Sequence, residues 1–121
     1  MDVLVGIEGS DESRLALDRT IDRAKEADDD LTVAVFAKEG QSIDDVEAWV
    51  EDELATAGLD AEIIRLETDH PASKLIELAE ADEFDQLVIG GGQRSPMGKI
   101  ELGSITEFIM LNAQVTVRLE R

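Results

Sequence analysis

Residues 87–104 of this chain read LVIGGGQRSPMGKIELGS, and this stretch decides the fold. The apolar run at 87–89 predicts a buried strand, because a strand covered on both faces carries successive aliphatic side chains. A glycine-rich loop follows, and Ser104 opens a helix predicted at 104–113. This order of strand, glycine-rich loop and helix N-terminus exposes backbone N–H groups to an anion, usually a phosphate.

Strand-like and helix-like segments alternate through the rest of the chain. Apolar runs predict strands at 2–8, 31–37, 61–66, 85–89 and 115–119. Apolar residues three and four positions apart predict helices from Ser10 to the aspartates at 28–30, from Ser42 to Gly58, at 71–82 and at 104–113. This alternation indicates one α/β domain over residues 1–121, a doubly wound five-stranded parallel sheet with helices on both faces. Ligands of such sheets lie beyond the carboxyl ends of the strands, where the strand order reverses.

The composition limits where the protein works. Aromatic residues are only 3% of the 121 residues, so the predicted core is aliphatic. There is no cysteine, no apolar run long enough to span a membrane and no basic leader before an apolar segment. We therefore expect a cytoplasmic protein with no membrane partner.

Acidic side chains dominate the charge, with 29 Asp and Glu against 11 Lys and Arg and a net charge of -18. Residues 1–84 hold 25 of the acids and 7 of the bases, whereas residues 85–121 hold four of each. The glycine-rich stretch therefore lies in the electrically balanced part of the chain. We interpret the acidity as that of a halophilic protein, because salt at about molar strength screens self-repulsion. An ordinary acidic protein is the alternative, and neither is typical of nucleic-acid binding.

Three motifs carry a resemblance to a known family. Gly90, residue 93 and the pair Gly103-Ser104 follow a signature of a glycine, two residues, a second glycine, nine residues and then Gly-Ser or Gly-Thr. Residues 3–13, VLVGIEGSDES, are similar to the end of the family's first strand, usually Val-Asp-Gly-Ser. Residues 103–109 and 115–118 are similar to its last helix and last strand. The chain thus resembles the universal stress proteins over essentially its full length, as an acidic haloarchaeal-type member.

The resemblance implies a Rossmann-like sheet of the adenine nucleotide alpha hydrolase type, with strand order 3-2-1-4-5. The family contains members that bind ATP and members that bind no nucleotide, so the resemblance leaves both open; in the binding members any Mg²⁺ is bound mostly by the phosphates. The resemblance also implies a homodimer formed through the strand at 115–119. Carried over to this chain, the nucleotide site consists of Glu8, Phe36, Ile89, Gly90, Gly91, Gly92, Gln93, Arg94, Gly103, Ser104 and Ile105. Two positions depart from the family pattern, since Gln93 replaces the second glycine and Glu8 replaces the first-strand aspartate.

Both departures bear on nucleotide binding. A Cβ at Gln93 conflicts with a positive φ or crowds a phosphate. Glu8 is one methylene longer than aspartate and either intrudes on the ribose or still reaches it. Arg94 and Lys99 add positive charge to the loop, either as phosphate contacts or as solvated bases.

The other candidate residues also have purely structural explanations. The glycines at 90–92 suit a phosphate cradle or a tight turn with close helix packing. Ser104 and Glu107 form a predicted capping box, which leaves the hydroxyl proton of Ser104 available to a phosphate. Phe36 either contacts adenine or belongs to the core.

Three functions follow from this pattern. The first is a dimeric stress-response module whose ATP occupancy changes what it binds. The second is a dimeric interaction protein of the same fold that binds no nucleotide. The third is slow ATP hydrolysis, which the residues favour least because no serine is matched with His70, the only histidine. A single histidine also argues against a metal site of the protein's own.

Overall fold

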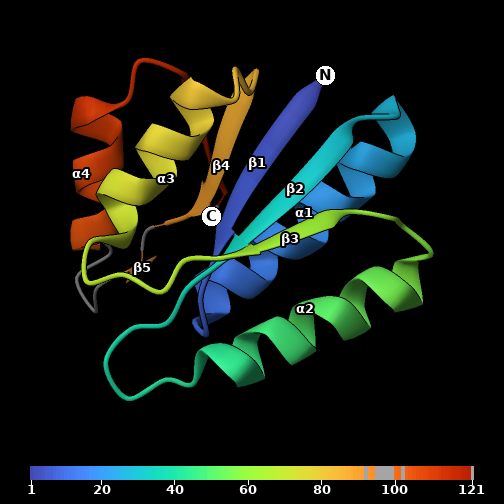
Figure 1. The fold of residues 1–121 in the computed structure, drawn as a ribbon, viewed down its shortest axis with the longest axis horizontal. Coiled ribbons are helices and arrows are strands. Elements are labelled where there is room, and N and C mark those ends of the chain that lie inside the picture. Colours follow the sequence, from blue (N-terminus) through green and yellow to red (C-terminus); the bar gives the residue numbers. More distant parts are fainter. Residues whose placement is uncertain (92, 95–99, 102, 121) are drawn as a thin grey trace.

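The computed structural model describes residues 1–91, 93–94, 100–101 and 103–120, with the pairs at 93–94 and 100–101 described by their backbone. Its elements alternate as predicted (Figure 1). In chain order they are β1 (Asp2–Ile7), α1 (Asp11–Ala27), β2 (Asp30–Val35), α2 (Ile43–Ala57), β3 (Glu62–Arg65), α3 (Pro71–Ala81), β4 (Gln86–Gly90), β5 (Gln93–Arg94), β6 (Ile100–Glu101), α4 (Ser104–Asn112) and β7 (Thr116–Glu120).

Five strands form one parallel sheet in the order β3-β2-β1-β4-β7, which confirms the predicted order 3-2-1-4-5. The chain builds outward from β1 to β3 and then crosses to the other side of β1 at β4. The strand order therefore reverses between β1 and β4, and the carboxyl ends of these two strands lie at the reversal point.

The sheet has a core on each face, which explains the continuous apolar runs in its central strands. Val3, Val5 and Ile7 of β1 pack with residues of α1 and α2 on one face. Leu4, Leu87 and Ile89 pack with residues of α3 and α4 on the other. Figure 1 shows this separation, with α3 and α4 together on one side of the strands and α1 and α2 on the other.

Predicted capping residues delimit the first two helices. The Ser10 hydroxyl accepts a hydrogen bond from the Ser13 backbone N–H at 3.2 Å, and Ser42 does the same for Asp45 at 3.4 Å. Gly58 ends α2 in the left-handed region, with φ of 67°. Asp28 ends α1 in the same conformation, with φ of 57°. These local signals place the helix ends within one or two residues of the prediction.

The predicted capping box at Ser104 is wrong. Gly103 is the N-cap residue of α4, with extended backbone (φ −67°, ψ 160°), and Ser104 is already the first helical residue. The Glu107 N–H donates to the Gly103 carbonyl at 3.0 Å, which closes the first turn one residue earlier than predicted. No side-chain hydrogen bond caps α4 within the described ranges.

The long loop after β4 contains a short ladder that the sequence did not predict. β5 and β6 pair antiparallel, Gln93 with Glu101 and Arg94 with Ile100. Gln93 therefore has strand backbone, which any residue adopts without strain, and the expected conflict with a positive φ does not arise there.

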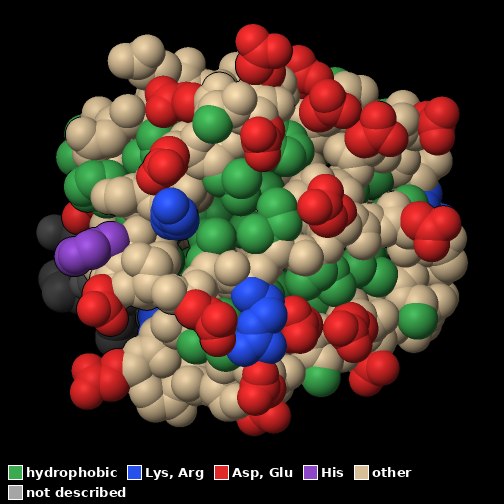
Figure 2. All heavy atoms as spheres, viewed as in Figure 1, with side chains coloured by type: hydrophobic (Ala, Val, Ile, Leu, Met, Phe, Trp, Pro, Cys, Tyr) green, Lys and Arg blue, Asp and Glu red, His purple; other side chains and the backbone are tan. Residues whose placement is uncertain are grey.

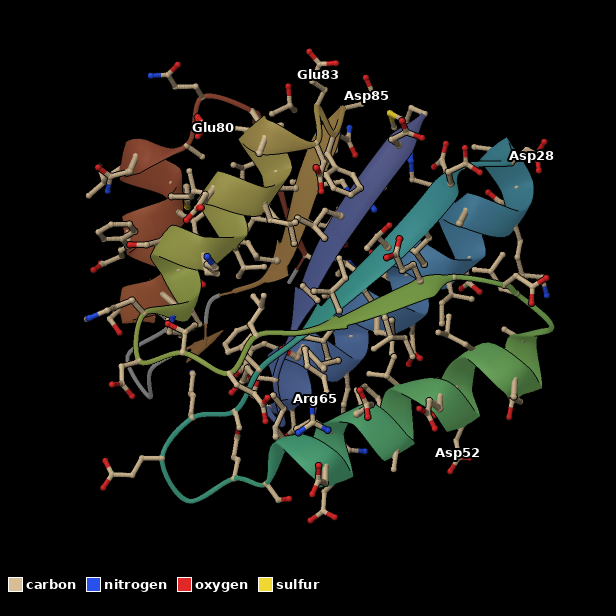
Figure 3. All side chains as sticks on the ribbon, in the orientation of Figure 1. Asp28, Asp52, Arg65, Glu80, Glu83 and Asp85 are labelled. Atoms are coloured by element: carbon tan, nitrogen blue, oxygen red, sulfur yellow. The ribbon has the colours of Figure 1, made fainter. Side chains whose placement is uncertain are left out.

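Carboxylates are scattered over the visible face of the molecule, around a central apolar area and with few basic groups among them (Figure 2). In Figure 3, Asp52 lies on the outer side of α2, and Glu80 and Glu83 lie at and after the end of α3. None of the helices in the described residues combines the length and apolar character needed to cross a bilayer.

Candidate functional site

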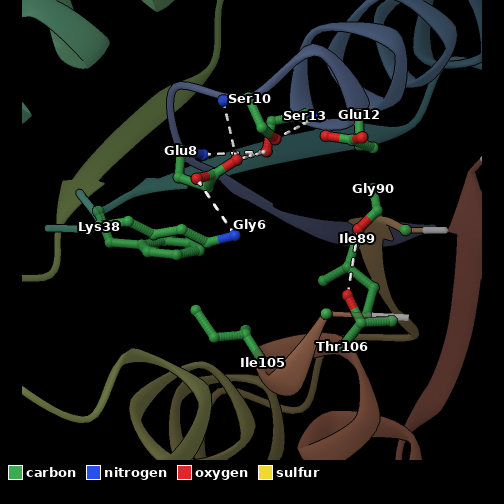
Figure 4. Close-up of a pocket in the computed structure, with 13 residues that line it drawn as sticks. Gly6, Glu8, Ser10, Glu12, Ser13, Lys38, Ile89, Gly90, Ile105 and Thr106 are labelled. Carbon is green, nitrogen blue, oxygen red and sulfur yellow. Dashed lines mark hydrogen bonds and ion pairs between the residues drawn. The ribbon is translucent and has the colours of Figure 1, made fainter. Parts of the chain in front are cut away.

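A cavity of about 280 Å³ opens at the carboxyl ends of β1 and β4 (Figure 4). Four parts of the chain contribute its walls: β1 with the turn into α1, the end of β2, the end of β4, and the start of α4. The lining residues are Gly6, Glu8, Ser10, Glu12, Ser13, Phe36, Lys38, Ile89, Gly90, Gly91, Gly103, Ile105 and Thr106. The cavity therefore lies where the reversal of strand order places the ligand of a doubly wound sheet.

Seven of the predicted site residues line this cavity: Glu8, Phe36, Ile89, Gly90, Gly91, Gly103 and Ile105. Ser104 lies instead in a neighbouring hollow beside the start of α3. The predictions for Gly92 and Lys99 fall outside the described residues, and those for the side chains of Gln93 and Arg94 concern residues described by backbone alone. The cavity thus brings together residues from positions 8 to 105 of the chain.

Sequence reasoning missed five polar residues of the cavity wall: Ser10, Glu12, Ser13, Lys38 and Thr106. Two of them make contacts that bear on the site. The Thr106 hydroxyl donates to the Gly90 carbonyl at 3.3 Å and so joins α4 to the end of β4. Lys38 follows β2, and its ammonium faces the carboxylate of Glu8. The position of Lys38 two residues after Phe36, at the same end of the sheet, was the signal that could have identified it.

The glycines of the cavity wall divide into two kinds. A Cβ on Gly90 would collide with the backbone carbonyl of Glu12, and one on Gly91 would collide with the side chain of Leu119. Close packing against backbone therefore explains Gly90, and packing also favours glycine at 91, where the end of the Leu119 side chain would have to move. Gly103 is different, because no heavy atom of the described residues lies within 4 Å of where its Cβ would be.

Gly103 stands at the N-terminus of α4, where backbone N–H groups and the helix dipole attract an anion. Ser10 and Ser13 bring the start of α1 to the same cavity. Ile89, Ile105 and Phe36 provide apolar surface between these two helix ends, and Phe36 is also part of the core beneath. The cavity thus offers apolar surface beside N-terminal helix turns.

Glu8 is buried, and the protein holds its carboxylate firmly. Its Oε1 accepts from the Ser10 N–H at 2.8 Å and from the Ser13 hydroxyl at 3.3 Å. Its Oε2 accepts from the Gln41 side-chain amide at 3.3 Å and lies 3.6 Å from the ammonium of Lys38. These partners fix Glu8 against the turn into α1, so it forms part of the cavity wall (Figure 4).

Comparisons with known proteins agree with this architecture. A family model described as the universal stress protein family matches residues 1–119. A universal stress protein of Mycolicibacterium smegmatis is 29% identical over 120 residues, which cover 90% of this chain and 88% of that protein. The structure of a universal stress protein from Archaeoglobus fulgidus superposes with a TM-score of 0.81 at 20% identity, covering 100% of this chain and 98% of that one.

Several similar structures contain a nucleotide. A universal stress protein in complex with cAMP is 27% identical with a TM-score of 0.76, and the match covers 100% of this chain and 96% of that one. Archaeoglobus fulgidus and Arabidopsis thaliana proteins of this fold are complexes with dAMP (18% identity, TM-score 0.74, covering 100% and 98%) and AMP (14%, 0.70, covering 99% and 90%). At these last identities the likeness concerns the fold alone.

Proposed function

The chain belongs to the universal stress protein family, and we propose that it is a stress-response module that binds an adenine nucleotide in the cavity between β1, β4 and α4. The complexes of similar proteins with cAMP, dAMP and AMP support this class of ligand. The open space in front of Gly103 is the observation that carries the proposal. A phosphate can approach the backbone at the start of α4 there, and packing gives no other reason for that glycine.

The walls suggest an orientation for the ligand. The adenine lies against Phe36, Ile89 and Ile105, and the phosphate lies at the N-terminus of α4. Glu8 lies between them, beside the ribose. Its carboxylate has about four acceptor positions, which are engaged by protein donors, so it shapes the ribose pocket more than it binds hydroxyls.

We take ATP with Mg²⁺ as the cellular ligand to test first, with the ion carried by the phosphates. Gly90, Gly91 and Gly103, at the two ends of the glycine-rich loop, line the cavity where the phosphates would lie. We place this activity in the cytoplasm, in keeping with a chain that has no cysteine.

Calorimetric titration with ATP–Mg²⁺ and with AMP tests the proposal, using the unaltered chain and Gly103→Val. The added side chain enters the open space, so the fold persists while the phosphate is displaced. Crowding of the phosphate by the valine side chain should cost about 1–3 kcal/mol of binding free energy, as overpacking does in a protein core. This corresponds to a loss of affinity of at least about fivefold.

His70→Val is the matched control, because His70 is the N-cap of α3 and likewise makes no side-chain cap hydrogen bond with the described residues. We expect this variant to bind as the unaltered chain does. Equal affinity of Gly103→Val and the unaltered chain, with both folded by circular dichroism, would contradict the proposed position of the phosphate.

We also propose that two copies associate along β7. This strand pairs with β4 on one side, and no described strand pairs with its other edge. Val117 and Leu119 on β7 are half-buried, while Met110 and Leu111 just before it are 49% and 83% exposed. Pairing of two such edges would satisfy the free backbone groups and cover apolar surface.

One observation favours the alternative of an interaction module that binds no nucleotide. Packing explains Gly90 and Gly91, and protein donors occupy the carboxylate of Glu8, so much of the site has a role without a ligand. Absence of heat and of a thermal shift with millimolar ATP–Mg²⁺, AMP and cAMP would favour this alternative over the nucleotide site.

A further inference from the structure

The ion pair between Lys38 and Glu8 is the loosest of the contacts around the Glu8 carboxylate. The distance from Nζ to Oε2 is 3.6 Å, whereas charge-assisted hydrogen bonds are about 2.7–2.9 Å. The side chain of Lys38 is 51% exposed and that of Glu8 only 5%. Figure 4 shows Lys38 extending into the cavity with its ammonium facing Glu8. Lys38 is therefore the mobile partner of a fixed carboxylate.

Glu8 does not depend on Lys38 to remain satisfied. Without it, the carboxylate still accepts from the Ser10 N–H, the Ser13 hydroxyl and the Gln41 amide. Gln41 is itself anchored, because its Oε1 accepts from the N–H groups of Gly9 at 3.2 Å and of Lys38 at 2.9 Å. Movement of the Lys38 ammonium thus leaves no buried charge without hydrogen bonds, which keeps the cost of that movement low.

The charges of the wall indicate what Lys38 is for. Glu8 and Glu12 both line the cavity, and Lys38 is the one basic side chain of the described lining. The buried carboxylate of Glu8 alone would repel an anionic ligand in this cavity. The ammonium of Lys38 offsets this repulsion, and it is carried by a half-exposed side chain that lines the cavity in which the phosphate would bind.

We infer that Lys38 is the residue by which the site selects a nucleotide over the corresponding nucleoside. On binding, its ammonium exchanges the Glu8 carboxylate for the phosphate of the ligand, and Glu8 keeps its three other donors. This inference rests on the proposed function and adds to it the side chain that recognises the anionic group. A nucleoside lacks that group and gains nothing from Lys38.

The test compares AMP with adenosine by calorimetry for the unaltered chain, Lys38→Met and Lys38→Arg. Lys38→Met keeps the length of the side chain and removes its charge, so the affinity for AMP falls about tenfold or more, as for loss of a charged hydrogen bond. The affinity for adenosine stays within about twofold, because adenosine has no phosphate and makes no use of the charge on Lys38. Lys38→Arg retains most of the preference for AMP.

Lys74→Met is the matched control. The side chain of Lys74 is 53% exposed, close to the value for Lys38, and its ammonium lies 3.6 Å from the Glu77 carboxylate, the same distance as in the Lys38–Glu8 pair. Unlike Lys38, it pairs with an exposed carboxylate and does not line the cavity. We expect this variant to bind both ligands unchanged.

The outcomes separate the two proposals. Equal losses of AMP and adenosine affinity in Lys38→Met would show that Lys38 only supports the wall, and would overturn this inference while the nucleotide site stands. An unaltered chain that binds AMP and adenosine equally well would overturn it as well. Failure of the unaltered chain to bind either ligand would overturn the proposed function, and the role of Lys38 with it.

Discussion

Single residues around the loop at 90–103 differ in what they contribute, although the sequence presents them alike. A Cβ on Gly90 or Gly91 would collide with neighbouring atoms, whereas a Cβ on Gly103 would meet no atom of the described residues beyond its chain neighbours. All three glycines line one cavity. The signature spacing predicted that glycines would gather here. It could not separate a glycine needed for packing from one that leaves room, since that difference depends on Glu12 and Leu119, which are distant in the chain.

Alanine at these three positions should rank them by stability. Gly90→Ala forces a rigid backbone carbonyl to move and should cost about 3 kcal/mol or more of unfolding free energy. Gly91→Ala meets the movable end of a leucine side chain and should cost about 1 kcal/mol, and Gly103→Ala should be nearly neutral. Denaturant unfolding measures the series, and a cost for Gly103→Ala equal to that of Gly90→Ala would contradict the difference in packing.

Glu83 has a left-handed backbone with φ of 54°, which is unfavourable for a residue with a side chain. Left-handed backbone costs a residue with a side chain about 1–2 kcal/mol, and glycine avoids this cost. Part of the gain is offset, because glycine has more conformational freedom in the unfolded chain. Glu83→Gly should therefore raise the free energy of unfolding by about 0.5–1 kcal/mol.

Asp82→Gly is the control for Glu83→Gly, because it removes the same charge one residue earlier, where φ is −95°. It should lower the free energy of unfolding by about 0.5–1 kcal/mol. If both variants shift stability in the same direction, the effect comes from the charge and not from the backbone.

At the scale of elements, the sequence predicted every strand of the main sheet and every helix of the described residues, because the apolar patterns are long and the caps specific. The strand order was predicted by the family resemblance and not by these patterns. The patterns failed where the signal is short. The start of α4 was predicted correctly at residue 104, but its N-cap was assigned to Ser104 and not to Gly103, since both residues are acceptable N-caps and only the backbone distinguishes them. The two-residue strands β5 and β6 are too short to show a period.

Two serine-to-alanine variants test the position of the α4 cap. Ser42→Ala removes the hydroxyl that accepts from Asp45 and should cost about 1 kcal/mol of unfolding free energy. Ser104→Ala removes a hydroxyl from the first helical position and should change stability by less than about 0.3 kcal/mol. Thermal or denaturant unfolding compares the two, and equal losses would restore Ser104 as the cap.

At the scale of the whole molecule, the free edge of β7 concerns assembly. We expect light scattering after size exclusion to give twice the mass of the 13.2 kDa chain. Leu111→Lys places a charge on the exposed apolar surface beside β7 and should give the monomer, while Asp52→Lys on α2 should leave the dimer intact. A 13.2 kDa species for the unaltered chain, or a dimer that survives Leu111→Lys, would contradict association through β7.

The net charge of -18 concerns stability, because the acids in Figures 2 and 3 lie mainly on the surface with few bases to pair with. At about 1 M salt the Debye length is about 3 Å, so repulsion among these carboxylates is screened in the folded state. We expect the free energy of unfolding to rise by more than about 1 kcal/mol between low salt and molar potassium chloride.

Salt also strengthens apolar burial, and a variant separates the two effects. Asp52→Lys with Glu80→Lys exchanges two exposed acids and should flatten the salt dependence, since apolar burial is unchanged. Equal slopes for this variant and the unaltered chain would assign the effect to the core, and greater stability in low salt would rule out adaptation to salt altogether.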